Sequence, residues 1–425
     1  MKIFAENFRG FSTVEVDLEK ITFLVGDNSS GKSSILHLVD SVLISGLTRP
    51  PRLNEDLGVS EYDYFSPYFD YANVIFGYLE EGANEGKDFF SKIITVRRKK
   101  NSVPEIILCS YLVDGNMITV GRHGEKGKLR VLRNIDTNSC NEIIDIHKKS
   151  TGYSIRTAPP KGVSVGDPAT LFSLMSREEF NEETYISKLF GEDPLSARLV
   201  SPIRALPEKF YTFSRKLSSQ GLHFATMWHD FSDTEKGRIF ASIEKFGRES
   251  KLFENIFVRR VSNKIDNSPL IVSLKKGKRE FLLNQVGVGV SQVVPILVET
   301  VFALRTEPKL KVLFQQPELH LHPVAQAALG SFLYRASKEG LRGVIESHSS
   351  YLLDRFRAEL RENAQTSKSS SKPSFSAHDA VIIFCENSEM GNTAYEINID
   401  ETGKLQNVPE SYYSFFIGEL TRTMF

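Results

Sequence analysis

One run of residues near the start of the chain has the types and spacing needed to hold a polyphosphate. Residues 26–33 read Gly-Asp-Asn-Ser-Ser-Gly-Lys-Ser. In this pattern the glycines let backbone amides curl around phosphate oxygens, the lysine reaches the β- and γ-phosphates, and the serine hydroxyl can ligate Mg²⁺. The nucleotide-binding residues predicted from it are Gly26, Asn28, Ser29, Gly31, Lys32, Ser33 and Ser34, with Ser33 also a metal ligand. We expect the ligand to be a nucleoside triphosphate.

The segments on either side of this run must position it, and both fit that task. Residues 21–25, Ile-Thr-Phe-Leu-Val, form a hydrophobic run suited to a buried strand. From Ser34 onward, apolar residues recur at intervals of three and four, which predicts an amphipathic helix whose N-terminus adds positive potential. The alternative is a strand-to-helix turn with an exposed lysine that binds no ligand. It does not explain why the motif is preceded by a strand pattern and followed by a helix pattern.

A second candidate for phosphate chemistry follows the hydrophobic run 310–314. It reads Gln-Gln-Pro-Glu-Leu-His-Leu-His-Pro over residues 315–323. Phosphate-loop enzymes usually end this strand in an acidic residue that holds the Mg²⁺ shell, with a water-activating group near the γ-phosphate. Glu318 is the only carboxylate in this run, and we assign Gln315, Gln316 and Glu318 to the catalytic group, with Gln315 also beside the metal.

Two further segments could meet the same ligand. Residues 343–349 form another strand that ends in His348, which could donate a hydrogen bond to the γ-phosphate. Residues 287–292, Gly-Val-Gly-Val-Ser-Gln, lead into an apolar helix and offer a second glycine-rich N-terminus suited to an anion.

Together these segments resemble the ATP-binding cassette superfamily, in particular its RecF/SMC/OLD-like ATPase heads. Residues 7–11, Asn-Phe-Arg-Gly-Phe, are similar to the opening of that group, and residues 287–292 to its degenerate signature motif. Residues 313–323 resemble the Walker B region with its Pro-Glu-Leu-His-Leu-His-Pro extension, and residues 346–349 the switch histidine. Residues 403–416 resemble the tail of stand-alone heads. The likeness covers most of the chain.

The resemblance implies ATP and Mg²⁺ as cofactors and a nucleotide-sandwich homodimer or higher homo-oligomer. In such a dimer the phosphate loop of one subunit and the signature helix of another enclose ATP. The resemblance assigns Arg9 to nucleotide binding in the same subunit, His348 to the catalytic group, and Gly287, Gly289, Ser291 and Gln292 to the signature that acts in trans. Nucleotide that contacts both subunits stabilises the closed form, so a switch follows.

One departure from the family pattern bears on turnover. Where the superfamily usually carries Asp-Glu, or Glu-Gln in close relatives, this chain has Gln315-Gln316. Glutamine cannot take a proton from water at physiological pH. Either Glu318 substitutes, or hydrolysis is slow, or the residue is an engineered change that blocks hydrolysis. We expect an ATPase whose turnover is weak or abolished.

Heads without a coiled-coil arm or a nuclease domain resemble the ATPase subunits of antiphage systems of the PtuA and AriA type. They act with a separate effector, a nuclease or a toxin. The sequence therefore predicts an ATP-driven switch of a DNA-linked defence system. Two alternatives stay open: an ATP-binding scaffold or sensor with little turnover, and a RecF-like DNA-repair ATPase. A small-molecule kinase gives no role to residues 287–292 or to His348.

Composition sets the outer limits. The chain has 425 residues, 40% hydrophobic and 25% charged, which is the composition of an ordinary globular protein. Its 53 basic and 53 acidic residues cancel, so no net positive charge attracts the whole chain to nucleic acid. Its three cysteines argue against a disulfide framework, and no long uncharged apolar segment predicts a membrane span. We expect a cytoplasmic protein that makes no membrane contact.

The organisation predicted is α/β, an ABC-type ATPase head without a long coiled coil. Residues 1–165 should form an N-terminal lobe with the phosphate loop and a mixed or antiparallel β subdomain. Residues 166–265 should form a helical insertion, and residues 266–425 a C-terminal lobe with the remaining motifs.

Other clusters allow two readings. His320 and His322, with His348, could hold a metal, although His-x-His alone is an incomplete ligand set. The basic runs 97–100, 259–260 and 275–279 could contact DNA or form solvated hairpin tips.

Overall fold

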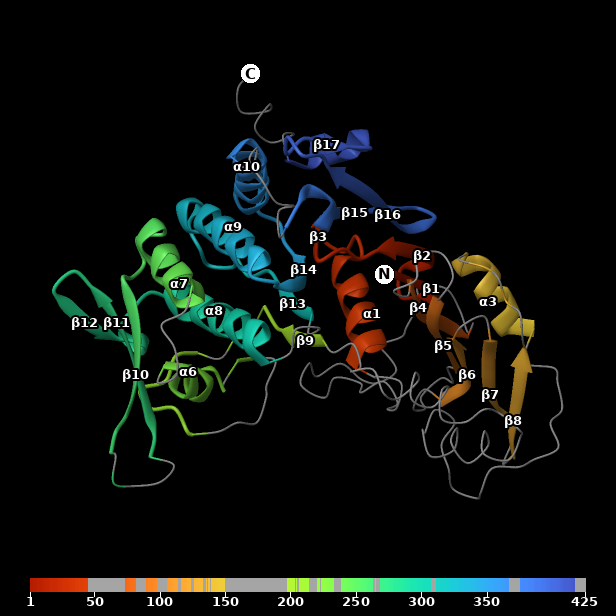
Figure 1. Ribbon diagram of the computed structural model, residues 1–425, viewed down its shortest axis with the longest axis horizontal. Helices are drawn as coiled ribbons and strands as arrows, with labels where there is room; N and C mark the ends of the chain where they lie inside the picture. The colour runs from red at the N-terminus through yellow and green to blue at the C-terminus, as the bar shows by residue number, and fades with distance from the viewer. Residues whose placement is uncertain are drawn as a thin grey trace. The chain divides into compact units, whose positions relative to one another are not determined.

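The computed structural model describes most of the chain in separate stretches (Figure 1). These are residues 1–44, 73–81, 89–97, 105–113, 116–123, 126–132, 135, 137, 139–149, 197–202, 204, 206–213, 220–221, 223–232, 238–262, 264, 268–306, 311–366 and 375–416. They divide between two compact units. Unit 1 comprises Met1–Leu18, Asp27–Ala197 and Cys385–Ala394, and unit 2 comprises Glu19–Gly26, Arg198–Phe384 and Tyr395–Phe425.

Unit 1 is built on an antiparallel β lobe. Its strands are β1 (Lys2–Phe8), β2 (Phe11–Asp17), β4 (Val74–Glu81), β5 (Phe89–Arg97), β6 (Glu105–Val113), β7 (Asn116–His123) and β8 (Lys126–Leu132). They form one sheet in the order β2-β1-β4-β5-β6-β7-β8, and every neighbouring pair is antiparallel. The unit also holds two helices, α1 (Lys32–Ile44) and α3 (Cys140–Lys149).

The amphipathic helix α3 joins the core of the lobe through its apolar face. Cys140, Ile143 and Ile144 are buried with Phe4 and Ile93 of the sheet in one hydrophobic cluster. On the same helix the buried His147 contacts both β5 and β6. Its Nε2 is 2.6 Å from Thr95 Oγ1, and its Nδ1 is 2.6 Å from Ser110 Oγ.

Unit 2 carries most of a second, mixed sheet. In the order β17-β16-β15-β3-β14-β13-β9, its strands are β17 (Leu405–Gln406), β16 (Gly391–Ile399), β15 (Ala380–Ser388), β3 (Ile21–Gly26), β14 (Arg342–Glu346), β13 (Lys311–Gln315) and β9 (Ala197–Val200). β14 pairs in parallel with both β13 and β3. β3 is buried along its whole length, as hydrophobic strands of a covered parallel sheet are.

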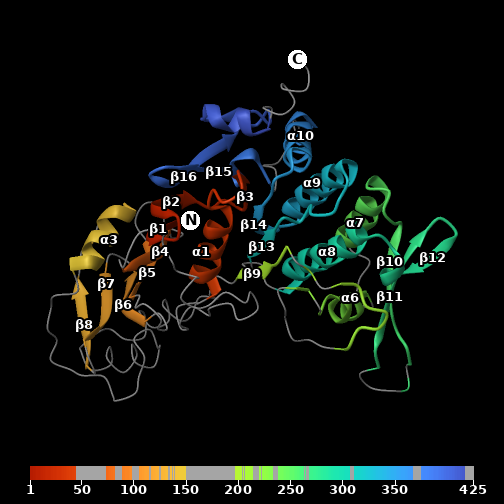
Figure 2. The same ribbon diagram turned by 180° about the vertical axis from the view of Figure 1, so that it is seen from behind.

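The described part of unit 2 also contains several helices. They are α6 (Phe224–Ser232), α7 (Arg238–Glu249), α8 (Val288–Thr306), α9 (Pro323–Lys338) and α10 (Ser350–Thr366), with 3-10 turns η3 (Leu283–Gln285) and η4 (Ala377–Asp379). Both Figure 1 and Figure 2 show α7, α9 and α10 following one another in a row, and α7 contacts α9, which contacts α10. α8 packs against β13.

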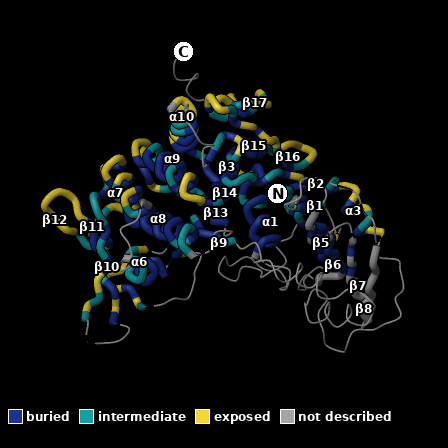
Figure 3. The backbone as a smooth tube through the Cα atoms, viewed as in Figure 1, coloured by how far each residue is buried: buried dark blue, intermediate teal, exposed yellow. Residues whose placement is uncertain are grey.

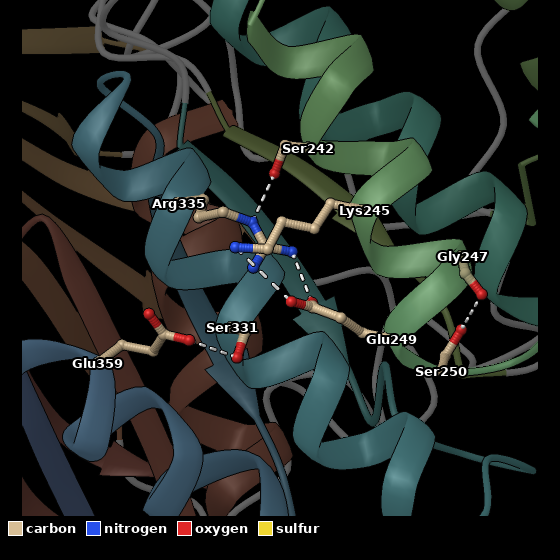
Figure 4. A network of polar contacts seen from close by, with 8 residues as sticks. All are labelled: Ser242, Lys245, Gly247, Glu249, Ser250, Ser331, Arg335 and Glu359. Carbon is tan, nitrogen blue, oxygen red and sulfur yellow. Dashed lines mark hydrogen bonds and ion pairs between the residues drawn. The ribbon is translucent and has the colours of Figure 1, made fainter. Parts of the chain in front are cut away.

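Polar contacts join the helices of this row (Figure 4). Arg335 of α9 donates through Nε to Ser242 Oγ at 2.9 Å and pairs through Nη2 with Glu249 at 3.1 Å, both on α7. One turn earlier on α9, Ser331 Oγ donates to Glu359 of α10 at 2.6 Å. α9 is therefore held to both neighbours by side chains as well as by apolar packing.

A small antiparallel sheet completes unit 2. β10 (Asn255–Arg260), β11 (Leu270–Lys276) and β12 (Arg279–Leu282) pair in that order. The turn between β11 and β12 is exposed (Figure 3). In the predicted helical insertion, residues 166–265, the described part contains α6 and α7 together with the strands β9 and β10, while residues 166–196 lie outside the described residues.

The predicted α/β class is confirmed, with an antiparallel N-terminal lobe and a core sheet that contains the phosphate-loop strand. The longest helix in the described stretches is α8, with 19 residues. By length and composition its residues Val288–Arg305 could cross a membrane, but 72% of them are buried inside the protein, as in a core helix.

Candidate nucleotide-binding site

The phosphate loop adopts the predicted strand-loop-helix form. β3 ends at Gly26, and α1 begins at Lys32. Gly31 has a φ of 101°, a conformation that favours glycine, and a Cβ at this position would lie 2.5 Å from the ring of Phe11 and 2.7 Å from Asn392 Nδ2. The loop therefore requires glycine here for both backbone and space.

The two residues behind Gly31 show what supports the loop. Phe11 begins β2, and the backbone N–H of Asn392 donates to the carbonyl of Gly10 at 2.8 Å. Asn392 is buried at the start of β16, far along the chain from the loop. No motif in the sequence points to Asn392, because only folding brings it to the phosphate loop.

The polar residues of the loop are arranged as an anion cradle. Lys32 is buried and its Nζ donates to the carbonyl of Asp27, so the ammonium is folded back over the loop. Ser30 Oγ is buried without a hydrogen-bond partner. Asn28 and Ser29 are exposed, and Ser33 and Ser34 in the first turn of α1 are partly exposed. A buried unpartnered hydroxyl beside a helix N-terminus fits a phosphate or its hydrated cation.

Arg9 lies close to α1, as its assigned role requires. It sits in the tight turn between β1 and β2 with a φ of 51°, and its guanidinium is 5.7 Å from the ring centre of Phe8. Burial, together with the nearby charge of Arg9, lowers the pKa of His37 on α1 to about 3. The positive charge of Arg9 therefore acts on a side chain of α1, the helix that follows the phosphate loop.

The end of β13, in unit 2, carries the Gln-Gln pair. Gln315 is buried, and its Nε2 donates to Glu346 Oε2 at 3.4 Å. Gln316 has a φ of 43° and donates its N–H to the carbonyl of Glu346 at 2.9 Å. The structure thus places Gln315 and Gln316 together at the carboxyl ends of β13 and β14.

A buried arginine holds this strand end. Arg204 is 3% exposed, and its Nη2 lies 3.2 Å from each of the carbonyl oxygens of Gln315 and Gln316. Its Nε and Nη1 are buried without partners. Burial lowers the pKa of the Arg204 guanidinium to about 10, while the nearby Glu318 opposes that shift. Arg204 therefore supports the end of β13.

Glu318, in the turn after β13, is hydrogen-bonded to the segment that follows β14. Its Oε1 accepts hydrogen bonds from Ser347 Oγ at 2.9 Å and from the backbone N–H of His348 at 2.8 Å, while its Oε2 is buried without a partner. Burial raises the pKa of this carboxyl, although the bond from His348 opposes the rise. The side chain of His348 is partly exposed.

The histidines of the Leu-His-Leu-His-Pro run do not form a metal centre with His348. His320 and His322 are both exposed, and His320 has a φ of 68°. Within the described ranges no group of three or more His, Cys, Asp or Glu side chains is arranged to hold a metal.

The signature-like segment forms the exposed tip of α8. A Cβ at Gly287 would meet nothing within 4 Å, and the side chain of Val288 is 50% exposed. A Cβ at Gly289 would lie 2.5 Å from the carbonyl oxygen of His320, so the tip packs against the turn that follows Glu318. Ser291 and Gln292 are buried within the subunit, and Ser291 Oγ donates to the carbonyl of Val288 at 2.9 Å. Only the first turn of the segment is open to a ligand or partner.

In a comparison with known families, residues 1–161 match the family model described as an AAA ATPase domain. No curated protein matches the chain.

Among solved structures, the chain is similar to SMC head domains. A structure of the SmcHead bound to the C-winged helix domain of ScpA is 15% identical, with a TM-score of 0.47 and coverage of 94% of this chain and 98% of that one. The SMC head domain from Thermotoga maritima is 11% identical, with a TM-score of 0.41 and coverage of 94% and 98%. A Smc head domain with an extended coiled coil, bound to the C-terminal domain of ScpA derived from Pyrococcus furiosus, is 12% identical, with a TM-score of 0.41 and coverage of 99% and 98%.

Proposed function

We propose that this protein is a cytoplasmic ATP-driven switch, which binds ATP with Mg²⁺, closes as a homodimer on it and controls a separate effector. The observation that carries the ATP site is the phosphate loop itself. Gly31 is wedged against Phe11 and Asn392, and Lys32 is buried at the start of α1 with its ammonium over the loop. This geometry offers backbone amides, one lysine and a helix N-terminus to a polyphosphate.

The side chains present fit a hard cation beside that ATP. Mg²⁺ takes oxygen ligands and keeps several waters, and it is bound through substrate phosphates with one or two protein groups. Ser33 offers a hydroxyl at the first turn of α1, and the end of β13 offers the amide oxygen of Gln315. Mg²⁺ held by these groups would neutralise the negative charge that develops on the phosphates.

Dimerisation is supported by the tip of α8. Gly287 is open, Val288 is half-exposed, and the helix N-terminus behind them can meet the γ-phosphate held by a second subunit. Because Gly289 packs against the His320 carbonyl, nucleotide at this tip would press on the turn that holds Glu318. Nucleotide that contacts both subunits would favour the closed dimer, and loss of the γ-phosphate would release it.

In this site Glu318 is a positioning residue, and His348 is the group that meets phosphate. The Oε1 atom of Glu318 holds Ser347 and the backbone of His348, which fixes the switch segment to the Walker B turn. Gln315 and Gln316 orient groups around the reacting water but cannot accept its proton. Turnover is therefore slow.

Two substitutions separate positioning by Glu318 from proton abstraction. Glu318→Gln keeps an oxygen that can accept from Ser347 and His348, so phosphate release should stay within a few-fold of wild type. Glu318→Ala removes the acceptor, and we expect a loss of about 10-fold or more, in line with about 1.4 kcal/mol per tenfold. If Glu318→Gln is as inactive as Glu318→Ala, the carboxylate acts as a base.

Contact with DNA is supported by the sheet β10-β11-β12. Basic residues outnumber acidic ones between positions 251 and 282, in a chain without net charge. They are Lys251, Arg259, Arg260, Lys264, Lys275, Lys276, Lys278 and Arg279. Lys276 and Arg279 stand directly opposite each other, a like-charge pair that disfavours the hairpin and that a phosphate backbone would relieve. Of the other basic run, residues 98–100 lie outside the described residues.

The antiphage setting and the separate nuclease or toxin rest on the resemblance of the chain to heads without a coiled-coil arm or a nuclease domain, and residues 403–416 resemble the tail of such stand-alone heads. Gene neighbourhood tests this setting. An adjacent nuclease, reverse transcriptase or toxin gene supports defence, whereas replication or recombination neighbours support the RecF-like repair role.

The ATP switch is tested by nucleotide binding and phosphate release. We expect wild type to bind ATP with Mg²⁺ and Lys32→Ala to bind it about 100-fold more weakly, because a charge-assisted phosphate contact is lost. Lys404→Ala, at an exposed lysine of unit 2, is the matched control and should bind as wild type does. Equal affinity of wild type and Lys32→Ala would contradict the proposal.

The second candidate is an ATP-binding scaffold or sensor without turnover, and Gln315-Gln316 favours it. Phosphate release separates the two. A wild-type rate equal to that of Lys32→Ala, with ATP binding intact, would establish the scaffold.

A further inference from the structure

The carboxylate that β13 lacks has a counterpart on the neighbouring strand. β13 ends in Gln315 and its next residue is Gln316, both neutral. β14 ends in Glu346, whose side chain is buried at 3% exposure. The strand register sets Glu346 directly opposite Gln315. An acidic group therefore stands at this edge of the sheet, one strand away from its usual place.

The contact between these two side chains explains why an amide stands at position 315. Gln315 Nε2 donates to Glu346 Oε2 at 3.4 Å. An aspartate or glutamate at 315 would instead face a second buried carboxylate, which raises the pKa of one of them and costs energy unless a cation lies between. Gln315 and Glu346 form a matched pair, in which the amide accommodates the relocated acid.

The place of β14 in the sheet sets this acid beside the strand that leads into the phosphate loop. β14 lies between β13 and β3, the strand that leads into the loop. Glu346 is in register with Leu24, and the N–H of Ser347 donates to the Leu24 carbonyl at 3.0 Å. The carboxyl ends of parallel strands are where sheets of this kind bind ligands. Glu346 is thus one strand nearer to the phosphate-loop strand than Gln315 is.

We propose that Glu346 supplies the carboxylate of the Mg²⁺ site, to the ion or to one of its waters, and that Gln315 orients this carboxylate through its amide nitrogen while its amide oxygen stays available to the ion. The inference rests on the proposed ATP site and reassigns the acidic metal group from β13 to β14.

Metal affinity tests this assignment without depending on turnover. Mn²⁺ serves as the probe, because its electron paramagnetic resonance signal reports its binding to the protein–ATP complex. We expect Glu346→Gln to weaken Mn²⁺ binding about 10- to 100-fold, the range for loss of a group that tunes a metal site. ATP affinity in EDTA should stay at the wild-type value. Glu359→Gln, the same chemical change on α10, is the matched control and should leave both unchanged.

A double variant that exchanges the acid and the amide between positions 315 and 346 tests the proposal even if the single variant is destabilised. Gln315→Glu with Glu346→Gln returns the acid to β13 and should recover Mn²⁺ affinity to within a few-fold of wild type, with an unchanged midpoint of thermal unfolding. Wild-type Mn²⁺ affinity in Glu346→Gln, or a swapped protein as weak as that variant, would overturn the inference. Absence of ATP binding by wild type in the presence of Mg²⁺ would instead overturn the proposed function.

Discussion

Two buried polar networks in this protein are built differently. In the β lobe of unit 1, both ring nitrogens of His147 have hydroxyl partners, and Ser110 Oγ also contacts Thr119 Oγ1 at 2.7 Å. At the end of β13 in unit 2, Arg204 and Glu318 are buried, but Nε and Nη1 of Arg204 and Oε2 of Glu318 have no partner. In the first network the ring nitrogens of the histidine are hydrogen-bonded, and we call it closed. In the second, some buried donors and acceptors have no hydrogen-bond partner.

The difference separates structure from function. A closed network of neutral groups stabilises and specifies its fold, because no buried polar atom goes unpaired. A network that buries charged groups with spare donors and acceptors carries a cost that proteins accept at functional sites. Substitutions in the network of the lobe should therefore change only the stability of the protein. Substitutions at the end of β13 should change both stability and the binding or hydrolysis of ATP.

The largest effect should come from Arg204→Met. This change removes the donor shared by the carbonyls of Gln315 and Gln316 and leaves Glu318 without a nearby positive charge. Breaking a buried charged contact of this kind costs about 3–5 kcal/mol. Urea unfolding measures the loss. Arg204→Lys should recover only part of it, because an ammonium does not reproduce the planar fork of guanidinium donors. A stability of Arg204→Met within about 0.5 kcal/mol of wild type, the range of ordinary surface changes, would remove Arg204 from the network.

A smaller effect, of opposite sign, is expected for Asp40→Asn on α1. Asp40 is 1% exposed, its Oδ1 has no partner, and burial raises its pKa to about 7. The folded state therefore binds this proton more tightly than the unfolded state, and stability falls as pH rises from about 4 to 7. Asparagine stays neutral, so Asp40→Asn should be about 2–4 kcal/mol more stable than wild type at pH 8. At pH 4 the two should agree, and a constant difference across this range would contradict the assignment.

His147→Ala should cost about 1–3 kcal/mol, because it leaves the buried hydroxyls of Thr95 and Ser110 without their partner. ATP affinity should not change. Urea unfolding and nucleotide titration of the same sample test both parts. A fall in ATP affinity with stability intact would show that the closed network serves the site, and the contrast between the two networks would fail.

The pH dependence of the lobe gives the finest distinction. Burial lowers the pKa of His147 to about 3, so the unfolded state binds the proton more tightly and stability falls as pH drops below about 6.5. This residue alone should cost about 2 kcal/mol between pH 7 and pH 5. His37 has a similarly lowered pKa and adds to the wild-type loss. In His147→Ala the free energy of unfolding should fall less steeply with decreasing pH, by the contribution of His147. An unchanged pH dependence would show that another group titrates.

The parts predicted from the sequence are those with local signals. The strand at residues 21–25, the phosphate loop and α1 follow from hydrophobic runs and from glycines within one short segment. Arg204, 111 residues from Gln315, and Asn392, which backs Gly31, belong to the site only through tertiary packing. Glu346 was visible as part of a strand, but its role depends on its register with Gln315, which no periodicity reveals.

The central claim, that ATP is held between the loop of one subunit and the α8 tip of another, is tested most directly by mixing two inactive variants. Lys32→Ala disables the loop, and Gly287→Asp places a negative charge at the open tip without a clash in its own subunit. Each variant alone should trap no slowly dissociating ATP. An equal mixture should trap about a quarter of the wild-type amount, since half of the dimers would then contain one intact composite site of two. Trapping by Gly287→Asp alone at the wild-type level, or none in the mixture, would contradict the account.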